Sequence, residues 1–114
     1  MDKEYVLYRW DREDLRGHVA LYIEDEENEL MMVDYTIGST CESFWGETDR
    51  ELTLTIDAER AGKILAYLKL EAAGDAIKTL GKWMRSEYKG CSDAATRFRE
   101  LSEKAGVKVD VFAW

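Results

Sequence analysis

The sequence contains no proline, one histidine and two cysteines among its 114 residues. No apolar run approaches the roughly 20 residues that a membrane-spanning helix needs, so we expect no membrane association. The first residues, Met-Asp-Lys-Glu, lack the basic and apolar regions of a signal peptide. Cys41 and Cys91 lie far apart without the spacing of a disulfide framework. We therefore expect reduced thiols and a cytoplasmic location.

The residue types that carry most enzyme chemistry are also scarce. His18 is the sole histidine, and nothing around Cys41 indicates an activated nucleophile. One histidine and two distant cysteines do not make a convincing zinc site. No glycine-rich phosphate loop or nucleophile-elbow motif is present, and the many carboxylates offer no preferred acid–base pair. The sequence predicts no catalytic residue, metal site or cofactor, and it favours a binding protein over an enzyme.

Acidic residues, by contrast, are plentiful and unevenly distributed. Residues 1–57 hold 16 acidic and 5 basic side chains, a balance of −11. Residues 58–114 hold 8 acidic and 11 basic side chains, a balance of +3, which gives the chain its net charge of −8. A field of this sign repels nucleic acid and membrane surfaces and attracts basic partners. We expect a basic protein partner and no direct contact with nucleic acid.

Apolar periodicity predicts the secondary structure of a single domain over residues 1–114. Alternation with a period of two predicts strands at 4–10, 18–24, 30–37, 51–56 and 107–114. A further strand at 40–45 is one interpretation of residues 38–50, and a long loop is the other. In the 51–56 strand, Leu52, Leu54 and Ile56 alternate with threonines, which is typical of a sheet with one covered face.

After Ile56 the apolar spacing changes to about 3.6 residues, which predicts three helices. The first runs from about 58 to 73 after an N-cap at Asp57, and the second from Asp75 to Gly90. The third is capped by Ser92 and ends near Gly106. The order β-β-β-(β)-β-α-α-α-β predicts an α+β fold, a mostly antiparallel sheet of four to six strands with three helices on one face.

Two segments are candidate partner-binding sites. The first is the acidic hairpin tip, comprising Glu24, Asp25, Glu26, Glu27 and Glu29, which is either a docking surface or a solvated turn that discourages aggregation. The second pairs large aromatics with nearby carboxylates, as binding hot spots do, and comprises Phe44, Trp45, Glu47 and Asp49. Alternation sends neighbouring side chains to opposite faces, so one of these aromatics pointing inward is the structural alternative.

Two further surfaces follow from the predicted elements. The outer sheet face is expected to carry Tyr22, Asp34, Thr53, Thr55, Lys108, Asp110 and Phe112, with Tyr5 or Tyr8 beside them. The second helix carries a basic stripe formed by Lys78, Lys82, Arg85 and Lys89. This stripe is a solvated face, or it contacts an acidic partner, an RNA backbone or a second copy in a homodimer.

Together these patterns predict a small acidic binding protein that docks on a larger basic partner and inhibits it. Immunity proteins and phage or mobile-element anti-defence inhibitors of nucleic-acid-processing enzymes are compact acidic domains of this kind. The comparison is an analogy of size and charge. The alternatives are a small-molecule-binding domain or small enzyme with a pocket between sheet and helices, and an oligomeric structural subunit.

Overall fold

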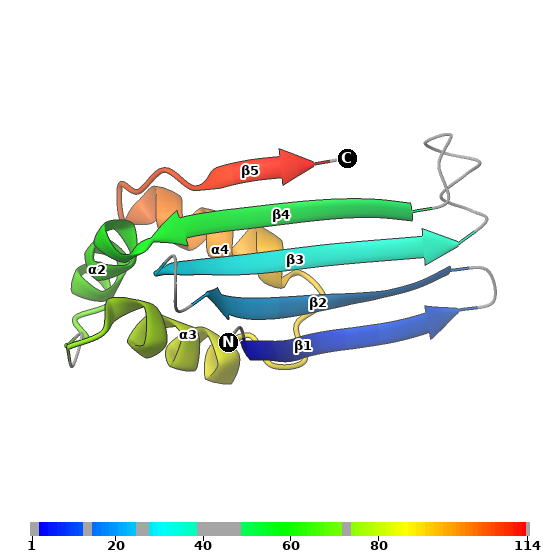
Figure 1. Cartoon of the computed structure of the whole chain (residues 1–114), viewed down its shortest axis with the longest axis horizontal. Helices are drawn as coiled ribbons and strands as arrows, with labels where there is room; N and C mark the ends of the chain where they lie inside the picture. The colour runs from blue at the N-terminus through cyan, green and yellow to red at the C-terminus, as the bar shows by residue number, and fades with distance from the viewer. Residues whose placement is uncertain (1–2, 13–14, 25–27, 39–48, 72–73, 114) are drawn as a thin grey trace.

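A computed structural model of the chain describes residues 3–12, 15–24, 28–38, 49–71 and 74–113. This part of the chain forms one five-stranded sheet and three helices (Figure 1). The strands are β1 (Lys3–Arg12), β2 (Leu15–Glu24), β3 (Glu29–Gly38), β4 (Asp49–Asp57) and β5 (Asp110–Ala113). The helices are α2 (Ala58–Tyr67), α3 (Ala76–Glu87) and α4 (Ala94–Lys104). The predicted α+β class is confirmed.

The strands lie in the sheet in the order in which they occur in the chain. Every neighbouring pair is antiparallel, and β5 joins the sheet beside β4, where Phe112 lies opposite Thr53. The alternative strand at 40–45 lies outside the described residues. Because residues 1–57 supply β1 to β4, the acidic half of the sequence forms most of the sheet, as predicted.

One face of the sheet packs against the helices. Figure 1 shows the helical layer on a single side of the sheet, with α4 crossing behind β3 and β4. On that side the strands contribute Leu7, Val19, Leu21, Ile23, Leu30, Met32, Leu54 and Ile56 to the buried core. The helices contribute Ala61, Ile64, Leu65, Ile77, Leu80, Met84, Tyr88, Ala94, Ala95 and Phe98. The apolar stripes that predicted the helices therefore face the core.

The N-caps of α2 and α3 are those predicted from the sequence, and the N-cap of α4 is not. The carboxylate of Asp57 accepts a hydrogen bond from the Arg60 amide at 2.9 Å, which confirms the predicted N-cap of α2. Asp75 caps α3 in the same way. The N-cap of α4 is Asp93 rather than the predicted Ser92, and its carboxylate binds the Arg97 guanidinium at 2.9 Å instead of a backbone amide.

Helix α2 ends six residues earlier than the predicted residue 73. Lys69 adopts a left-handed conformation with φ of 60°, and its amide donates to the Ala66 carbonyl. The Leu70 amide donates to the Leu65 carbonyl at 2.9 Å, which completes a Schellman motif. The prediction extended the helix to Gly74 because glycine normally occupies the position that Lys69 takes here.

Helix α3 is held close to the β1–β2 side of the sheet. A Cβ atom on the buried Gly81 would lie 2.9 Å from Cδ1 of Ile23, so glycine permits the approach of α3 to β2. The pairing of β1 with β2 is irregular between Val6 and Tyr8, and the Leu7 carbonyl accepts a hydrogen bond from the Gly90 amide at 2.7 Å. The turn after α3 therefore binds the outer edge of β1.

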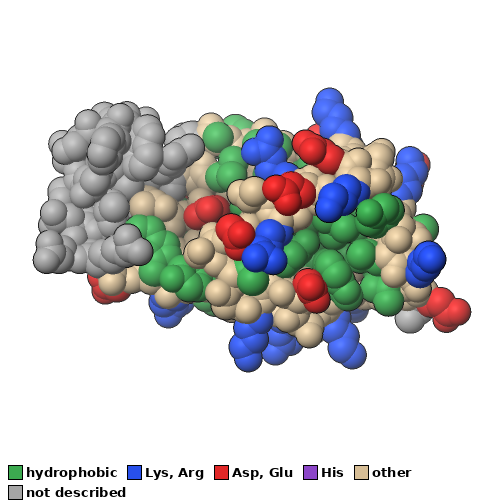
Figure 2. Space-filling model, turned by 180° about the vertical axis from the view of Figure 1, so that it is seen from behind, with side chains coloured by type: hydrophobic (Ala, Val, Ile, Leu, Met, Phe, Trp, Pro, Cys, Tyr) green, Lys and Arg blue, Asp and Glu red, His purple; other side chains and the backbone are tan. Residues whose placement is uncertain are grey.

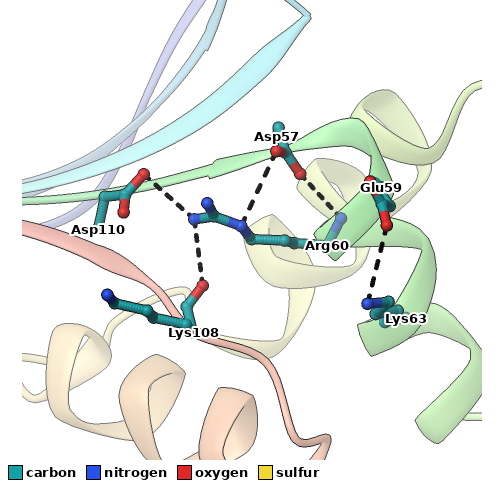
Figure 3. A network of polar contacts seen from close by, with 6 residues as sticks. All are labelled: Asp57, Glu59, Arg60, Lys63, Lys108 and Asp110. Atoms are coloured by element: carbon teal, nitrogen blue, oxygen red, sulfur yellow. Dashed lines mark hydrogen bonds and ion pairs between the residues drawn. The ribbon is translucent and has the colours of Figure 1, made fainter.

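A polar network attaches β5 to the rest of the fold (Figure 3). The Arg60 guanidinium donates to the Lys108 carbonyl at 3.2 Å and to the Asp110 carboxylate at 3.1 Å. Its Nε atom lies 3.8 Å from the Asp57 carboxylate, so one side chain links the end of β4 to the start of β5. None of the helices in the described ranges combines the length and apolar character needed to cross a lipid bilayer.

Candidate binding face

The sheet face opposite the helices is the candidate binding surface, and we call it the open face. The strand registers place one residue from each strand in a central row across it, formed by Val6, Ala20, Val33, Thr53 and Phe112. The middle three of these residues are at most 9% exposed, although no described helix covers them. At the two ends, Val6 is 41% exposed and Phe112 is 63% exposed. The open face is therefore apolar at its centre.

A second row lies beside the central row, toward the β2–β3 turn. It consists of Glu4, Tyr22, Met31, Thr55 and Asp110. The Tyr22 hydroxyl donates a 2.5 Å hydrogen bond to the Glu4 carboxylate. Burial, this hydrogen bond and the charges of Glu4 and Glu51 raise the pKa of Tyr22 to about 12. Tyr22 is therefore neutral at physiological pH and fixed in position on the face.

A third row lies on the other side of the central row. It consists of Arg9, His18, Tyr35 and Glu51. The rings of His18 and Tyr35 pack with their centroids 5.7 Å apart and their planes inclined at 42°. Beside them is a surface hollow of about 430 Å³, lined by Arg9, Trp10, Asp11, Arg16, Gly17, His18 and Tyr35. This hollow lies at the end of the sheet, not between sheet and helices.

Carboxylates dominate the charge of the open face. The register places Glu24, Glu29 and Asp57 in one row at the β2–β3 turn, and Glu4, Glu51 and Asp110 among the rows described above. The basic side chains that share this face are Arg9 and Arg16. Arg60 partly offsets Asp57 and Asp110, with which it forms ion pairs. The rim of the apolar centre is therefore mainly acidic, with its carboxylates concentrated toward the β2–β3 turn and both arginines at the opposite end.

No protein-family model, curated protein sequence or solved structure matches this chain. Its function is inferred from the geometry of the open face.

Three of the nine predicted partner-binding residues lie in the described part of the chain, at two ends of the sheet. Glu24 and Glu29 lie opposite each other at one end of the sheet. Asp49 pairs with Ile37 at the other end, eight residues along β3 from Glu29, a separation of roughly 27 Å. Asp25, Glu26, Glu27, Phe44, Trp45 and Glu47 lie outside the described residues. Glu24 and Glu29 thus lie at the opposite end of the sheet from Asp49.

The outer-face prediction is correct for five residues and wrong for Asp34, and neither Tyr5 nor Tyr8 lies on that face, since they pair with the core residues Leu21 and Val19. Tyr22, Thr53, Thr55, Asp110 and Phe112 share the open face as expected. Asp34 pairs with Val19 and Leu52 on the helix side, and Tyr5 packs against the core there. Polarity placed Asp34 outside because the alternate phase, with Met31, Val33 and Tyr35, is the more apolar one, yet that phase faces outward. The prediction missed Met31, Val33 and Tyr35 for the same reason.

The described residues include no group of three or more His, Cys, Asp or Glu side chains placed to hold a metal ion. His18 shares its hollow with one carboxylate, Asp11, and Cys91 lies at the edge of the core as a free thiol. The open face therefore offers aromatic, apolar and acidic groups for binding.

Proposed function

We propose that this chain is a small acidic binding protein that docks its open face on a larger, basic protein and inhibits it by occlusion. The observation that carries the proposal is the apolar central row inside a mainly acidic rim. Interfaces gain most affinity from a few buried aromatic or apolar anchors, and charged rims act mainly on association rate and partner choice. The open face has both parts in this arrangement.

The exposed ends of the central row supply the proposed anchors. Phe112 and Val6 lose most of their exposed surface when a partner covers the face, which stabilises the complex by roughly 25 cal/mol per Å² of apolar area. Glu4, Glu24, Glu29 and Glu51 attract a basic surface before contact. Proteins that process nucleic acid carry such surfaces because they neutralise phosphates, so we propose a partner of this class acting in the cytoplasm.

The test begins with capture of the partner from the native host, elution by a salt gradient, and identification by mass spectrometry. Binding of the purified partner is then measured for the wild type and for Phe112→Asp. The matched control is Tyr67→Asp on α2, because Tyr67 is also exposed, at 47%, but lies away from the open face. We expect at least tenfold weaker binding for Phe112→Asp and less than a threefold change for Tyr67→Asp.

Salt dependence tests the electrostatic part of the proposal. The association rate should fall steeply between about 50 and 500 mM salt, since screening shortens the range of the acidic field. A second variant neutralises Glu24, Asp25, Glu26, Glu27 and Glu29 together. If this variant binds as fast as the wild type, the acidic turn has no role in docking. If Phe112→Asp binds as tightly as Tyr67→Asp, the open face is not the docking surface.

Small-molecule binding in the hollow beside His18 is the second candidate function. The hollow, of about 430 Å³, brings an imidazole, a carboxylate and two guanidinium groups to one place. These groups suit a small anionic metabolite. A thermal-shift screen with a metabolite panel should then give a hit that disappears in His18→Ala, whereas a panel without any hit opposes this candidate.

A further inference from the structure

A groove runs between the outer edge of β1 and helix α3. Two adjacent cavities of about 220 and 560 Å³ share Tyr5, Lys82 and Arg85 in their walls. The smaller one is floored by Ile23 and reaches Lys78, and the larger one extends along Glu4 to Val6 and reaches Lys89. We call this the β1–α3 groove. It lies at the sheet edge and meets the central row of the open face at Val6.

The α3 wall of the groove is strongly basic. It carries Lys78, Lys82 and Arg85 of the predicted basic stripe, and Lys89 follows in the turn after α3; all four are exposed. Figure 2 shows Lys and Arg side chains gathered along the lower margin of the helical side, the margin on which α3 and β1 lie in Figure 1. The chain has a net charge of −8, so this wall is a locally positive region on a negatively charged protein.

Most of these cations lack an ionic partner within the described part of the chain. Lys78 lies 4.0 Å from the Asp75 carboxylate, but neither Lys82 nor Lys89 forms an ion pair with any described carboxylate. The Arg85 guanidinium lies 4.3 Å from the centroid of the Tyr5 ring. This cation–π contact leaves the charge of Arg85 available to an anion. The groove therefore presents unneutralised positive charge beside an aromatic floor.

The β1 wall of the groove is the edge of the sheet. An edge strand leaves alternate backbone N–H and C=O groups unpaired, which makes it a template for an added strand. The Gly90 amide already occupies the edge at Leu7, so the free stretch is the one along Glu4 to Val6. The Glu4 carboxylate accepts from Tyr22 on the open face, which directs its charge away from α3.

The cations are close enough together for an extended acidic chain to reach several of them. Lys82 and Arg85 are three residues apart in α3, roughly 4.5 Å along its axis, and Lys89 follows in the turn after the helix. Side chains on one side of an extended strand recur every 6.6 Å or so. A strand added to β1 with acidic residues at every second position therefore brings its carboxylates within reach of these long basic side chains.

We propose that the β1–α3 groove binds an extended acidic peptide segment, which adds to the edge of β1 and pairs its carboxylates with Lys82, Arg85 and Lys89. Strand addition supplies backbone hydrogen bonds, and the cations select acidic side chains. This site takes a partner of opposite charge to that proposed for the open face, and the two surfaces meet at β1, where Glu4 and Val6 border both.

The test uses a fluorescent octapeptide of alternating Glu and Val, with binding measured by anisotropy on the full chain. Controls are a Lys and Val octapeptide, a block peptide with four Glu followed by four Val, and a single-stranded RNA of similar charge. Two further probes carry N-methyl groups on alternate residues, in one phase or the other. Because an edge strand pairs with alternate residues of its neighbour, only one N-methyl phase should abolish binding.

The protein variants are Lys82→Glu with Arg85→Glu, and a control with the same charge change, Arg99→Glu with Lys104→Glu on α4. Circular dichroism and thermal unfolding establish that both variants are folded. We expect the groove variant to lose at least tenfold in affinity for the alternating peptide, and the α4 variant to lose less than threefold.

Three outcomes overturn the proposal. If the RNA or the block peptide binds as well as the alternating peptide, the groove is a general polyanion site. If both N-methyl phases bind normally, no strand is added to β1. If no probe binds, the groove has no such ligand. Light scattering on the full chain, run alongside, reports whether the acidic run of a second copy occupies the groove instead, which would also overturn the proposal.

Discussion

The guanidinium of Arg60, in the first turn of α2, lies 3.1 Å from the carboxylate of Asp110 at the start of β5. The same side chain donates to the Lys108 carbonyl, so it is the polar link between the helical layer and the last strand. The Arg60 side chain is only 30% exposed, which strengthens the link relative to a fully solvated pair.

Replacement of Arg60 by Ala should therefore lower the free energy of unfolding by about 1 kcal/mol, from the lost ion pair and hydrogen bond. Lys63→Ala is the control, because Lys63 pairs with Glu59 on the same helix with both side chains well exposed. The control should change stability by less than about 0.5 kcal/mol. Urea titrations of the two variants compare them directly. Equal losses of stability in the two variants would mean that the Arg60 contacts do not stabilise the attachment of β5.

Gly17 should not tolerate a side chain. A Cβ atom there would lie 2.5 Å from the Tyr35 carbonyl oxygen and 2.9 Å from Nε1 of Trp10. The carbonyl belongs to the neighbouring strand and cannot move without disturbing the sheet, so Gly17→Ala should cost about 2–3 kcal/mol. Gly62→Ala is the control, since nothing lies within 4 Å of its added Cβ. In helix α2 that change should stabilise by roughly 0.5–1 kcal/mol. A neutral Gly17→Ala would contradict the close approach of β3 and Trp10.

Lys69 occupies a position that glycine would fill better. Its φ of 60° carries a steric cost for any residue with a Cβ atom. Lys69→Gly should raise the free energy of unfolding by roughly 0.5–1 kcal/mol, after allowance for the more flexible unfolded chain. Lys63→Gly, in the helical part of α2, should lower it by about 1 kcal/mol. Thermal unfolding measures both, and a loss in Lys69→Gly would argue against the Schellman motif.

Tyr22 and Tyr88 should ionise late. Burial, followed by the carboxylates nearby, raises the pKa of each from the ordinary value of 10.0 to about 12. Between pH 10 and 12 the unfolded chain loses these protons while the folded chain retains them, so stability falls as pH rises through this window. Below pH 10 the contribution is fully present.

Ultraviolet titration measures the ionisation of the tyrosine side chains directly. Tyr22→Phe should remove one late-ionising group, and Glu4→Gln should shift Tyr22 to lower pH without affecting Tyr88, because the Glu4 bond and charge act on Tyr22 alone. A Tyr22 titration unchanged in Glu4→Gln would show that the hydrogen bond between them does not form in solution.

The fold was predictable where a single alternation dominates a segment. Leu54 and Ile56 of β4, and Leu21 and Ile23 of β2, face the core as their spacing predicts. In β3 the more apolar phase lies on the open face, so polarity alone assigned the two faces incorrectly, and pairing with β2 and β4 decides them. The end of α2 was missed because a lysine adopts the left-handed conformation that marks a helix end.

The candidate sites were less accessible to sequence reasoning. The outer face was largely predicted from alternation, because residues of one strand share a face whatever their neighbours are. The basic stripe on α3 was also visible. The contact of Arg85 with Tyr5 could not be predicted, because it depends on α3 lying beside β1. No local pattern specifies which strand a helix packs against.

The strand order bears on which strand of the sheet forms last and unfolds first. Each pairing from β1 to β4 joins consecutive strands, whereas β5 reaches β4 only after the chain has passed through three helices. Because loop-closure entropy opposes this long-range pairing, we expect β5 to be the last strand to form, and its four exposed residues to make it the first to fray. Phe112, a proposed anchor of the open face, lies on this strand. A partner that binds there must also slow hydrogen exchange across Asp110–Ala113. Partner affinity and the stability of the pairing of β5 with β4 should therefore increase or decrease together.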